Sequence, residues 1–196
     1  MRVGLFGGSF DPVHLGHLLV ARAALEELSL DRLIWLPAAQ SPFKPGTTPA
    51  PAALRTRMLR LALAGESRFQ VDDREVRRGG TSFTIDTVRE LGREGGAGDG
   101  TDLFWLIGAD HVPTLPAWRE AEALAGLVEF VVIPRPGQSF IPLPPPFRLR
   151  PLRGWPLGLS SSEVRERVRR GATLEPLVPA AVAEVVRIEG LYRGGA

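Results

Sequence analysis

Short apolar runs alternate along the 196-residue chain with longer stretches whose apolar residues recur at helical spacing. The short runs predict strands over residues 3–6, 32–36, 69–71, 103–107 and 128–133. The longer stretches predict helices over residues 15–28, 52–64, 85–91 (opened by Thr84), 117–125, 162–170 and 180–188. Several strands are apolar on both faces, which is typical of a parallel sheet covered by helices on both sides. The pattern therefore predicts one doubly wound, Rossmann-like α/β domain over residues 1–196, in which ligands bind at the carboxyl ends of the strands.

Two stretches interrupt this alternation. Residues 37–51 are rich in proline, alanine, serine and threonine, and predict a long loop after the second strand. Residues 134–158 contain eight prolines and predict a surface excursion with an edge strand near residues 147–152. Residues 92–100 are glycine-rich and predict a flexible loop. The acidic run Asp72–Asp73 and the nearby Glu75 are interpreted as a solvated turn.

Composition excludes several classes of protein. The chain has no cysteine, so it has no disulfide, no thiolate metal site and no cysteine nucleophile. No apolar run approaches the roughly eighteen residues that span a bilayer, and no signal peptide is recognised, so we expect a cytoplasmic protein without a membrane partner. The net charge of the chain is only +2. The isoelectric point near 9.9 is high because almost all of the basic residues are arginines, which keep their protons to very high pH. We therefore expect no nucleic-acid partner, and we leave open a homo-oligomer.

The first predicted strand ends in Gly7 and Gly8, and a helix is predicted to begin shortly afterwards. Glycines let the backbone approach a phosphate closely, and a helix N-terminus offers unpaired N–H groups. His14 and His17 lie three residues apart, so they share one face of the first helical turn. The two imidazoles are compatible with zinc binding, with capping and packing, or with phosphate binding. Their spacing alone does not decide among these alternatives.

A second anion site is predicted near the end of the chain. The serines of residues 160–162 precede a predicted helix, where their hydroxyls cap its N-terminus and join its exposed amides in binding an anion. Arg165 falls on the first turn of that helix, within reach of the same phosphates in a bidentate manner. By itself the serine run is also compatible with a simple helix cap.

Together the two segments resemble the signatures of the H-x-G-H nucleotidyltransferase superfamily, at residues 7–17 (GGSFDPVHLGH) and 159–165 (LSSSEVR). Further segments resemble the bacterial nicotinate-mononucleotide adenylyltransferases: residues 36–45, 80–87, 106–110 with 115–118, 134–137 and 190–192. The chain departs from that family at Ala39 and Phe43, where asparagine and histidine are usual. Lys44, the only lysine in the chain, matches. A lysine is a compact charge suited to a phosphate.

The resemblance implies a reaction between ATP and nicotinate mononucleotide that gives deamido-NAD and pyrophosphate. It implies Mg²⁺ held mainly through the ATP phosphates, with no metal site built from protein side chains alone. It implies that the last helices, about residues 160–192, close over the phosphate end. The implied catalytic residues are His14, His17 and Arg165. The implied ATP-binding residues are Gly7, Gly8, Ser9, Phe10, Gly108, Asp110, Ser160 and Ser161. The implied mononucleotide-binding residues are Lys44, Thr84, Ile85, Trp118 and Arg135.

Chemistry agrees with two of these roles. An indole such as that of Trp118 can stack on a pyridine ring, and backbone amides near Thr84 can hold a carboxylate. Three alternatives remain beside this function. They are a nicotinamide-mononucleotide adenylyltransferase, a pantetheine-phosphate adenylyltransferase and a non-catalytic nucleotide-sensing protein. The intact His14, His17 and Arg165 disfavour the last.

Overall fold

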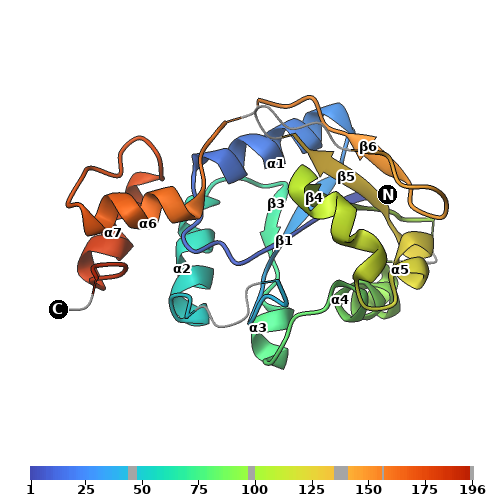
Figure 1. The fold of residues 1–196 in the computed structure, drawn as a ribbon, viewed down its shortest axis with the longest axis horizontal. Helices are drawn as coiled ribbons and strands as arrows, with labels where there is room; N and C mark the ends of the chain where they lie inside the picture. The colour runs from blue at the N-terminus through green and yellow to red at the C-terminus, as the bar shows by residue number, and fades with distance from the viewer. Residues whose placement is uncertain (44–47, 97–99, 135–140, 156, 195–196) are drawn as a thin grey trace.

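A computed structural model describes residues 1–43, 48–96, 100–134, 141–155 and 157–194, and everything below concerns those residues. Its centre is a parallel sheet of six strands in the order β3-β2-β1-β4-β5-β6 (Figure 1). The strands are β1 (Arg2–Gly8), β2 (Arg32–Pro37), β3 (Phe69–Val71), β4 (Asp102–Gly108), β5 (Glu129–Ile133) and β6 (Leu149–Pro151). The order reverses beside β1, which places the switch point of this doubly wound sheet between β1 and β4.

Strand residues alternate between two apolar layers. Along β1, Leu5 faces one layer and Phe6 the other, and both side chains are buried. In β2, Trp35 and Leu36 divide in the same way. Because side chains alternate across a strand, a sheet that is apolar on both faces must be covered on both. The predicted doubly wound α/β fold is confirmed.

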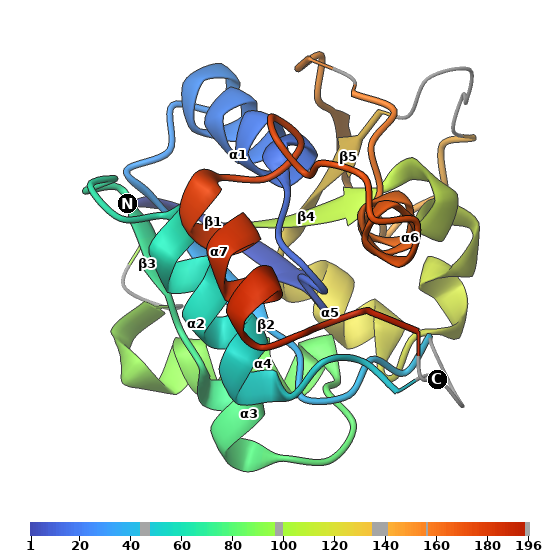
Figure 2. The same cartoon turned by 90° about the vertical axis from the view of Figure 1, so that its left-hand side faces the viewer.

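Helices cover the two faces in separate groups, as Figures 1 and 2 show. The helices are α1 (Leu15–Glu27), α2 (Ala52–Ala62), α3 (Arg74–Arg78), α4 (Thr84–Leu91), α5 (Ala121–Leu127), α6 (Ser161–Arg169) and α7 (Ala180–Ile188). One core contains buried residues of α1, α2, α6 and α7. The other contains buried residues of α4 and α5 and of the 3₁₀ segment η2 (Ala109–Ala117). In Figure 1, α6 and α7 stand together at one end of the molecule.

Three local predictions are wrong. The helix predicted over residues 117–125 begins only at Ala121, because the preceding Glu120 has a left-handed backbone with φ of 50°. A residue with a left-handed backbone cannot belong to a right-handed α-helix, so the helix cannot extend towards the N-terminus past Glu120. Residues 109–117 form η2 instead. Of the flexible loop predicted over residues 92–100, residues 92–96 form a π-helical turn instead, and residues 97–99 lie outside the described residues. The solvated turn predicted around Glu75 is the short helix α3.

The edge strand predicted near residues 147–152 is confirmed as β6, which pairs in parallel with β5. The closing of residues 160–192 over a phosphate stays a prediction. Among helices in the described ranges, none is both long and apolar enough to cross a bilayer.

Candidate active site

The loop that follows β1 is held in an unusual backbone conformation. Phe10 has a φ of 46°, a region that non-glycine residues rarely adopt, and its ring is buried against Phe6. A side chain at Gly7 would place its Cβ 2.7 Å from the Trp105 ring. Only glycine therefore allows Trp105 to lie beneath the loop. The backbone of residues 7–10 thus turns tightly over the carboxyl end of β1, as the sequence predicts.

The two histidines of the first motif are arranged as a stacked pair at the start of α1. Their ring centroids are 3.7 Å apart, and the backbone N–H of His14 donates to Nδ1 of His17 at 3.2 Å. Because Nδ1 of His17 accepts this bond, the proton of the neutral imidazole lies on Nε2. The turn therefore selects the tautomer of His17 whose Nε2–H donates a hydrogen bond.

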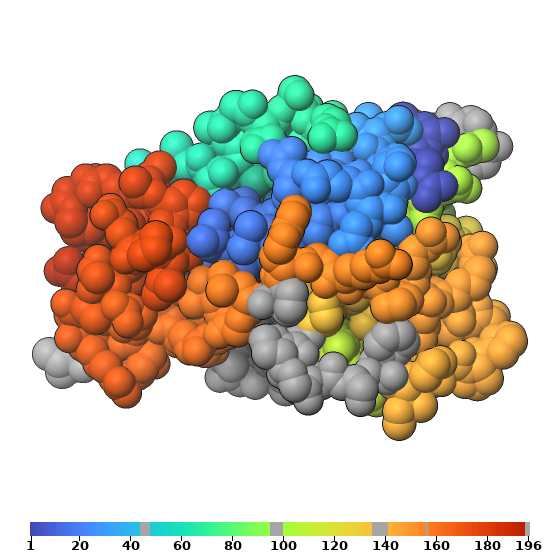
Figure 3. Space-filling model, turned by 90° about the horizontal axis from the view of Figure 1, so that it is seen from above, coloured from blue at the N-terminus to red at the C-terminus, as the bar shows by residue number. Residues whose placement is uncertain are grey.

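The second motif lies directly beside the first. Ser161 Oγ donates to the Pro12 carbonyl at 2.9 Å, and Arg165 Nη1 donates to the Asp11 carbonyl at 2.7 Å. Figure 3 shows the C-terminal segments in orange and red packed against the blue N-terminal ones. Segments about 150 positions apart in sequence are thereby joined at the switch point.

Ser160 caps α6 as predicted, and forms a reciprocal capping box with Glu163. The Ser160 and Ser161 hydroxyls donate within the protein, to Glu163 Oε2 and to Pro12 O. Other donors at this end of α6 include the first-turn N–H groups and the Arg165 guanidinium. The serines therefore position the donors rather than supply all of them.

Asp11 connects this junction to the end of the chain. Its Oδ1 accepts from the Tyr192 hydroxyl at 2.7 Å and from the Ala50 N–H at 3.1 Å. Burial and the neighbouring Asp11 carboxylate raise the pKa of Tyr192 above its usual value, so Tyr192 remains a neutral donor. Asp11 and Arg165 are also within ion-pair range at 3.7 Å.

Three pockets open at the carboxyl edge of the sheet, and Ser9 lines all of them. The first, here called the histidine pocket, has a volume of about 450 Å³. It brings together both histidines and all eight residues predicted to bind ATP. These are Gly7, Gly8, Ser9, Phe10, His14, His17, Gly108, Asp110, Ser160 and Ser161.

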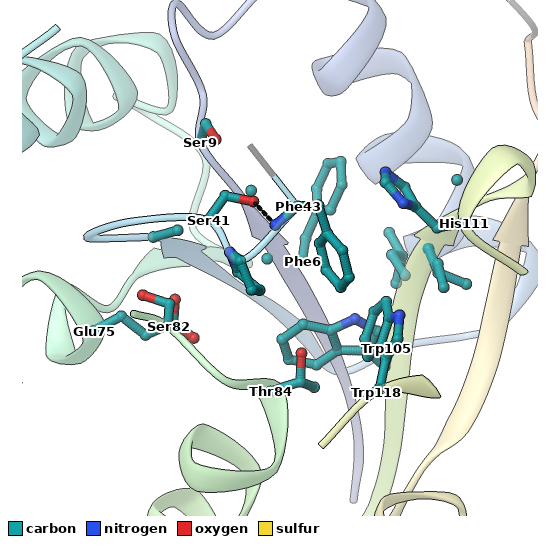
Figure 4. Close-up of a pocket in the computed structure, with 17 residues that line it drawn as sticks. Phe6, Ser9, Ser41, Phe43, Glu75, Ser82, Thr84, Trp105, His111 and Trp118 are labelled. Carbon is teal, nitrogen blue, oxygen red and sulfur yellow. Dashed lines mark hydrogen bonds between the residues drawn. The ribbon is translucent and has the colours of Figure 1, made fainter. Parts of the chain in front are cut away.

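The aromatic pocket, of about 210 Å³, lies beside the histidine pocket and contains Thr84 and Trp118 (Figure 4). Trp118 Nε1 donates to Thr114 Oγ1 at 3.2 Å, which orients the indole. Phe43, one of the two departures from the family pattern, packs against the Trp118 ring with centroids 5.1 Å apart. At this position the chain thus presents an aromatic ring to the pocket. Ala39, the other departure, donates its N–H to Ser82 Oγ at 3.0 Å.

The third pocket, here called the arginine pocket, has a volume of about 300 Å³. Arg165 lines it together with Arg55, Asp11 and Ser162. The Arg165 side chain is oriented by Ser162 Oγ, which accepts from Nη2 at 3.0 Å. This pocket is the most cationic of the three.

One predicted binding residue, Ile85, does not bring its side chain into these pockets. The Ile85 side chain is fully buried in the core, so only its backbone is available to a ligand. Lys44 and Arg135 lie outside the described residues.

Glu75 was predicted to be solvated, and this is wrong. Its side chain is 4% exposed, lines the aromatic pocket, and accepts from Thr87 Oγ1 at 2.6 Å and from Ser82. Burial raises the pKa of Glu75, although these two hydrogen bonds oppose the shift. Ser82 Oγ in turn accepts from the Ala39 N–H. Glu75 therefore ties the start of α4 to the loop after β2 (Figure 4).

Three further pocket residues were missed by sequence reasoning. His111 lines both the histidine and the aromatic pockets, Trp155 lines the histidine pocket while half exposed, and Arg55 lines the arginine pocket. His111 follows the Asp110 motif directly, so its proximity to that motif could have indicated it. Trp155 lies in the proline-rich excursion, where no pattern marks it.

No group of three or more metal-ligating side chains occurs within the described ranges. Asp110 is an exposed carboxylate at the histidine pocket. Such an arrangement suits a divalent cation bound by substrate phosphates and at most one carboxylate. Nucleotidyl transfer generally uses a divalent cation.

Comparisons with known proteins agree with this geometry. The model of the cytidylyltransferase-like family matches residues 5–167. A probable nicotinate-nucleotide adenylyltransferase from Opitutus terrae is 42% identical over 196 residues, covering 98% of each chain. One from Thermus thermophilus is 42% identical over 193 residues, covering 98% of this chain and all of the relative. The nicotinic acid mononucleotide adenylyltransferase of Plasmodium falciparum, complexed with NaAD, superimposes with a TM-score of 0.76. That structure is 16% identical and covers 99% of this chain and 98% of its own, so it supports the fold.

The doubly wound sheet, the two motifs that meet at its switch point and the matching family model together define a nucleotidyltransferase of the cytidylyltransferase-like family. Within that class, the full-length relatives are decisive. The chain belongs to the nicotinate-nucleotide adenylyltransferase family.

Proposed function

We propose that this enzyme transfers the adenylyl group of ATP to nicotinate mononucleotide, giving deamido-NAD and pyrophosphate. The observation that carries the proposal is the junction of the histidine and aromatic pockets. They share the backbone of Gly7, Gly8 and Ser9, so a nucleotide in one and an aromatic mononucleotide in the other bring their phosphates together there.

The reaction needs no covalent enzyme intermediate. A phosphate oxygen of the mononucleotide forms a bond to the α-phosphorus of ATP, while the bond from that phosphorus to the α–β bridging oxygen breaks. The attacking phosphate is already anionic, so no general base is needed. Pyrophosphate leaves with the negative charge that develops on the bridging oxygen. Catalysis therefore depends on alignment of the two substrates and on stabilisation of that charge.

His17 is well suited to the second task. Its Nε2–H is the donor because His14 N–H occupies Nδ1. A preorganised donor needs no reorientation as charge develops on the phosphates. His14 stacks against it, and Arg165 approaches from α6 with its guanidinium already held by Asp11 O and Ser162 Oγ. These three side chains are assigned to the phosphates of ATP and the leaving pyrophosphate.

Mg²⁺ is the divalent cation proposed here. Asp110, an exposed carboxylate at the histidine pocket, is assigned to share it with the ATP phosphates. When bound, the ion neutralises charge on the phosphates. ATP and nicotinate mononucleotide are the only partners proposed.

The mononucleotide is assigned to the aromatic pocket. The Trp118 indole offers a stacking face for the pyridine ring. Thr84 lines the same pocket at the start of α4, and we assign the first N–H groups of that helix as donors for the carboxylate. A helix N-terminus favours an anion, so this position favours nicotinate over the uncharged nicotinamide. Lys44 and Arg135, outside the described residues, are proposed to contact the mononucleotide.

A pyrophosphate-release assay with ATP and Mg²⁺ tests the function. Nicotinate mononucleotide, nicotinamide mononucleotide and 4′-phosphopantetheine are compared as acceptors at equal concentration. We expect kcat/KM for nicotinate mononucleotide to exceed the other two by at least about tenfold, the effect of roughly 1.4 kcal/mol of added transition-state stabilisation. Preference for either other acceptor would reassign the enzyme. Nucleotide binding without release from any acceptor would favour the nucleotide-sensing alternative.

A further inference from the structure

Arg55 on α2 is a buried cation that the proposed mechanism does not use. Its side chain is 1% exposed, and it lines the wall of the arginine pocket. Among the described residues, the guanidinium donates to four backbone carbonyls: Nε to Ala50 O at 2.9 Å, Nη1 to Ser9 O at 2.6 Å, and Nη2 to Ala38 O at 2.8 Å and Ala39 O at 3.2 Å.

These carbonyls belong to two loops. Ser9 follows β1, while Ala38 and Ala39 begin the loop between β2 and α2 and Ala50 lies near its end. A planar guanidinium with five N–H donors can hold such groups at fixed spacing, whereas carbonyl groups cannot bind one another. Arg55 therefore sets the relative position of the backbone segments that frame all three pockets, because Ser9 lines each of them.

Within the part of the chain that the structure describes, no direct ion pair cancels the charge of Arg55. Among the ion pairs of the described residues, none includes Arg55, and its hydrogen-bond acceptors are neutral. Burial lowers the pKa of Arg55, while Asp11 and Tyr192 act in the opposite direction. An arginine nevertheless keeps its proton near neutral pH. Arg55 thus adds a second positive charge beside Arg165 in the same pocket.

We propose that Arg55 is a positioning residue for a polyphosphate site in the arginine pocket. It holds the loops after β1 and β2 at the spacing that the phosphates require. Its positive charge, at the wall of the pocket, also attracts the phosphates. The ligand class is a diphosphate: the two terminal phosphates of ATP and the pyrophosphate released from it. Only the identity of that diphosphate rests on the proposed function, because anion binding does not require turnover.

Two substitutions of Arg55 separate the effect of its several N–H donors from the effect of its charge. Arg55→Lys keeps one positive charge but has a single ammonium group, which cannot reach all four carbonyls in the two loops. Arg55→Met removes the charge as well. The matched controls are Arg60→Lys and Arg60→Met on the same helix, where Arg60 is 58% exposed and paired with Asp73. Circular dichroism at the assay temperature identifies the folded variants.

Binding of inorganic pyrophosphate, ATP and AMP is measured by calorimetry with Mg²⁺. We expect Arg55→Lys to weaken pyrophosphate and ATP binding about tenfold and Arg55→Met about a hundredfold. These changes correspond to losses of roughly 1.4 and 2.8 kcal/mol in binding free energy. AMP, which lacks the two terminal phosphates, should bind within about threefold of wild type, and the Arg60 variants should behave as wild type.

A general structural defect would weaken AMP and pyrophosphate equally, and that result overturns the proposal. So does pyrophosphate affinity within about twofold of wild type in folded Arg55→Lys. If Arg55→Met does not fold, the lysine variant alone decides. Arg55-dependent pyrophosphate binding in an enzyme that does not use nicotinate mononucleotide would uphold this inference while rejecting the proposed function. Normal turnover with unchanged pyrophosphate binding in the variants would do the reverse.

Discussion

His17 illustrates how a backbone contact prepares a side chain for chemistry. Its Nδ1 accepts the His14 N–H, so the turn selects one tautomer before any substrate binds. The ring also meets Phe10 edge-on, with centroids 5.1 Å apart. Phe10 is itself held at a positive φ of 46°. A strained residue thus supports a preorganised donor, a combination that is frequent at functional sites.

Replacing His17 by alanine is expected to lower kcat by roughly a hundredfold or more, the scale of losing one transition-state donor. The KM values should change less, because the donor acts mainly on charge that develops during the reaction. His17→Gln, which keeps an N–H at the end of a comparable side chain, should lose less activity than the alanine variant. Steady-state kinetics with both substrates measure this. A near-normal kcat in His17→Ala would remove the assigned role.

Glu75 predicts a pH dependence of stability. Burial raises its pKa in the folded protein. The stability that it contributes is therefore full below the unfolded pKa, about 4.3, and is lost as the pH rises through the folded value. Glu75→Gln does not titrate. The free energy of unfolding of wild type minus that of the variant should fall from pH 4 to pH 8, as measured by urea denaturation. A difference that rises with pH would contradict the burial effect.

Sequence reasoning found the residues whose roles depend on motif and missed those whose roles depend on burial. The residues quoted from the two signatures gather at one edge of the sheet. Arg55 shares a helical face with the buried Met58 and Leu59, a spacing that could have indicated its burial. Its partners are loop carbonyls, which leave no trace in side-chain patterns. The buried position of Glu75 depends on hydrogen bonds with Thr87 and Ser82, which come close to it only in the folded chain.

At the scale of elements, α6 carries the second motif to the first. Ser160 begins the helix, Ser161 attaches it to the loop after β1, and Arg165 follows on the same helix. The direction of the guanidinium therefore depends on how well the first turn of α6 is formed. A capping box is the local device that forms it.

Ser160→Ala is expected to lower the free energy of unfolding by about 1 kcal/mol, the usual cost of losing an N-cap. Ser160→Asn, whose side chain also caps, should recover most of this loss. Chemical denaturation of both variants provides the measurement. Equal stability of wild type and Ser160→Ala would mean that the tertiary contacts of Ser161 and Arg165 alone hold α6 in place.

Elements with a strong apolar period were predictable, and short or proline-containing ones were not. The strands near the centre are apolar on both faces, so their pattern survives any loop geometry. Helix α3 has only five residues, too few to show a period. The segment η2 contains Pro113 and Pro116. These prolines are compatible with 3₁₀ geometry, but in a sequence they indicate a loop rather than a helix. The start of α5 was misplaced because the left-handed backbone of Glu120 leaves no mark in the apolar pattern.

At the scale of the whole molecule, the segment that follows α7 returns to the loop after β1 at Asp11. Tyr192 reaches it from beyond α7, and its hydroxyl donates to Oδ1 across a separation of 181 residues. Helix α7 packs on α2 as part of the same core. The C-terminal segment thus helps to hold the loop that carries the first motif, although it lies outside the matched region of residues 5–167.

Tyr192→Phe removes only the hydroxyl and leaves Asp11 with the Ala50 N–H and the nearby Arg165. Because hydrogen bonds to charged groups contribute about 1.5–3 kcal/mol, we expect the free energy of unfolding to fall by roughly that amount. Glu189→Gln is the matched control. It weakens the ion pair between Glu189 and Arg57 at the same end of α7, where the two side chains are 34% and 53% exposed. An exposed pair contributes less than about 1 kcal/mol. Urea denaturation measures the free energy of unfolding of both variants. If the control lost as much stability as Tyr192→Phe, the result would contradict a specific role of the Tyr192 hydroxyl in holding the loop after β1.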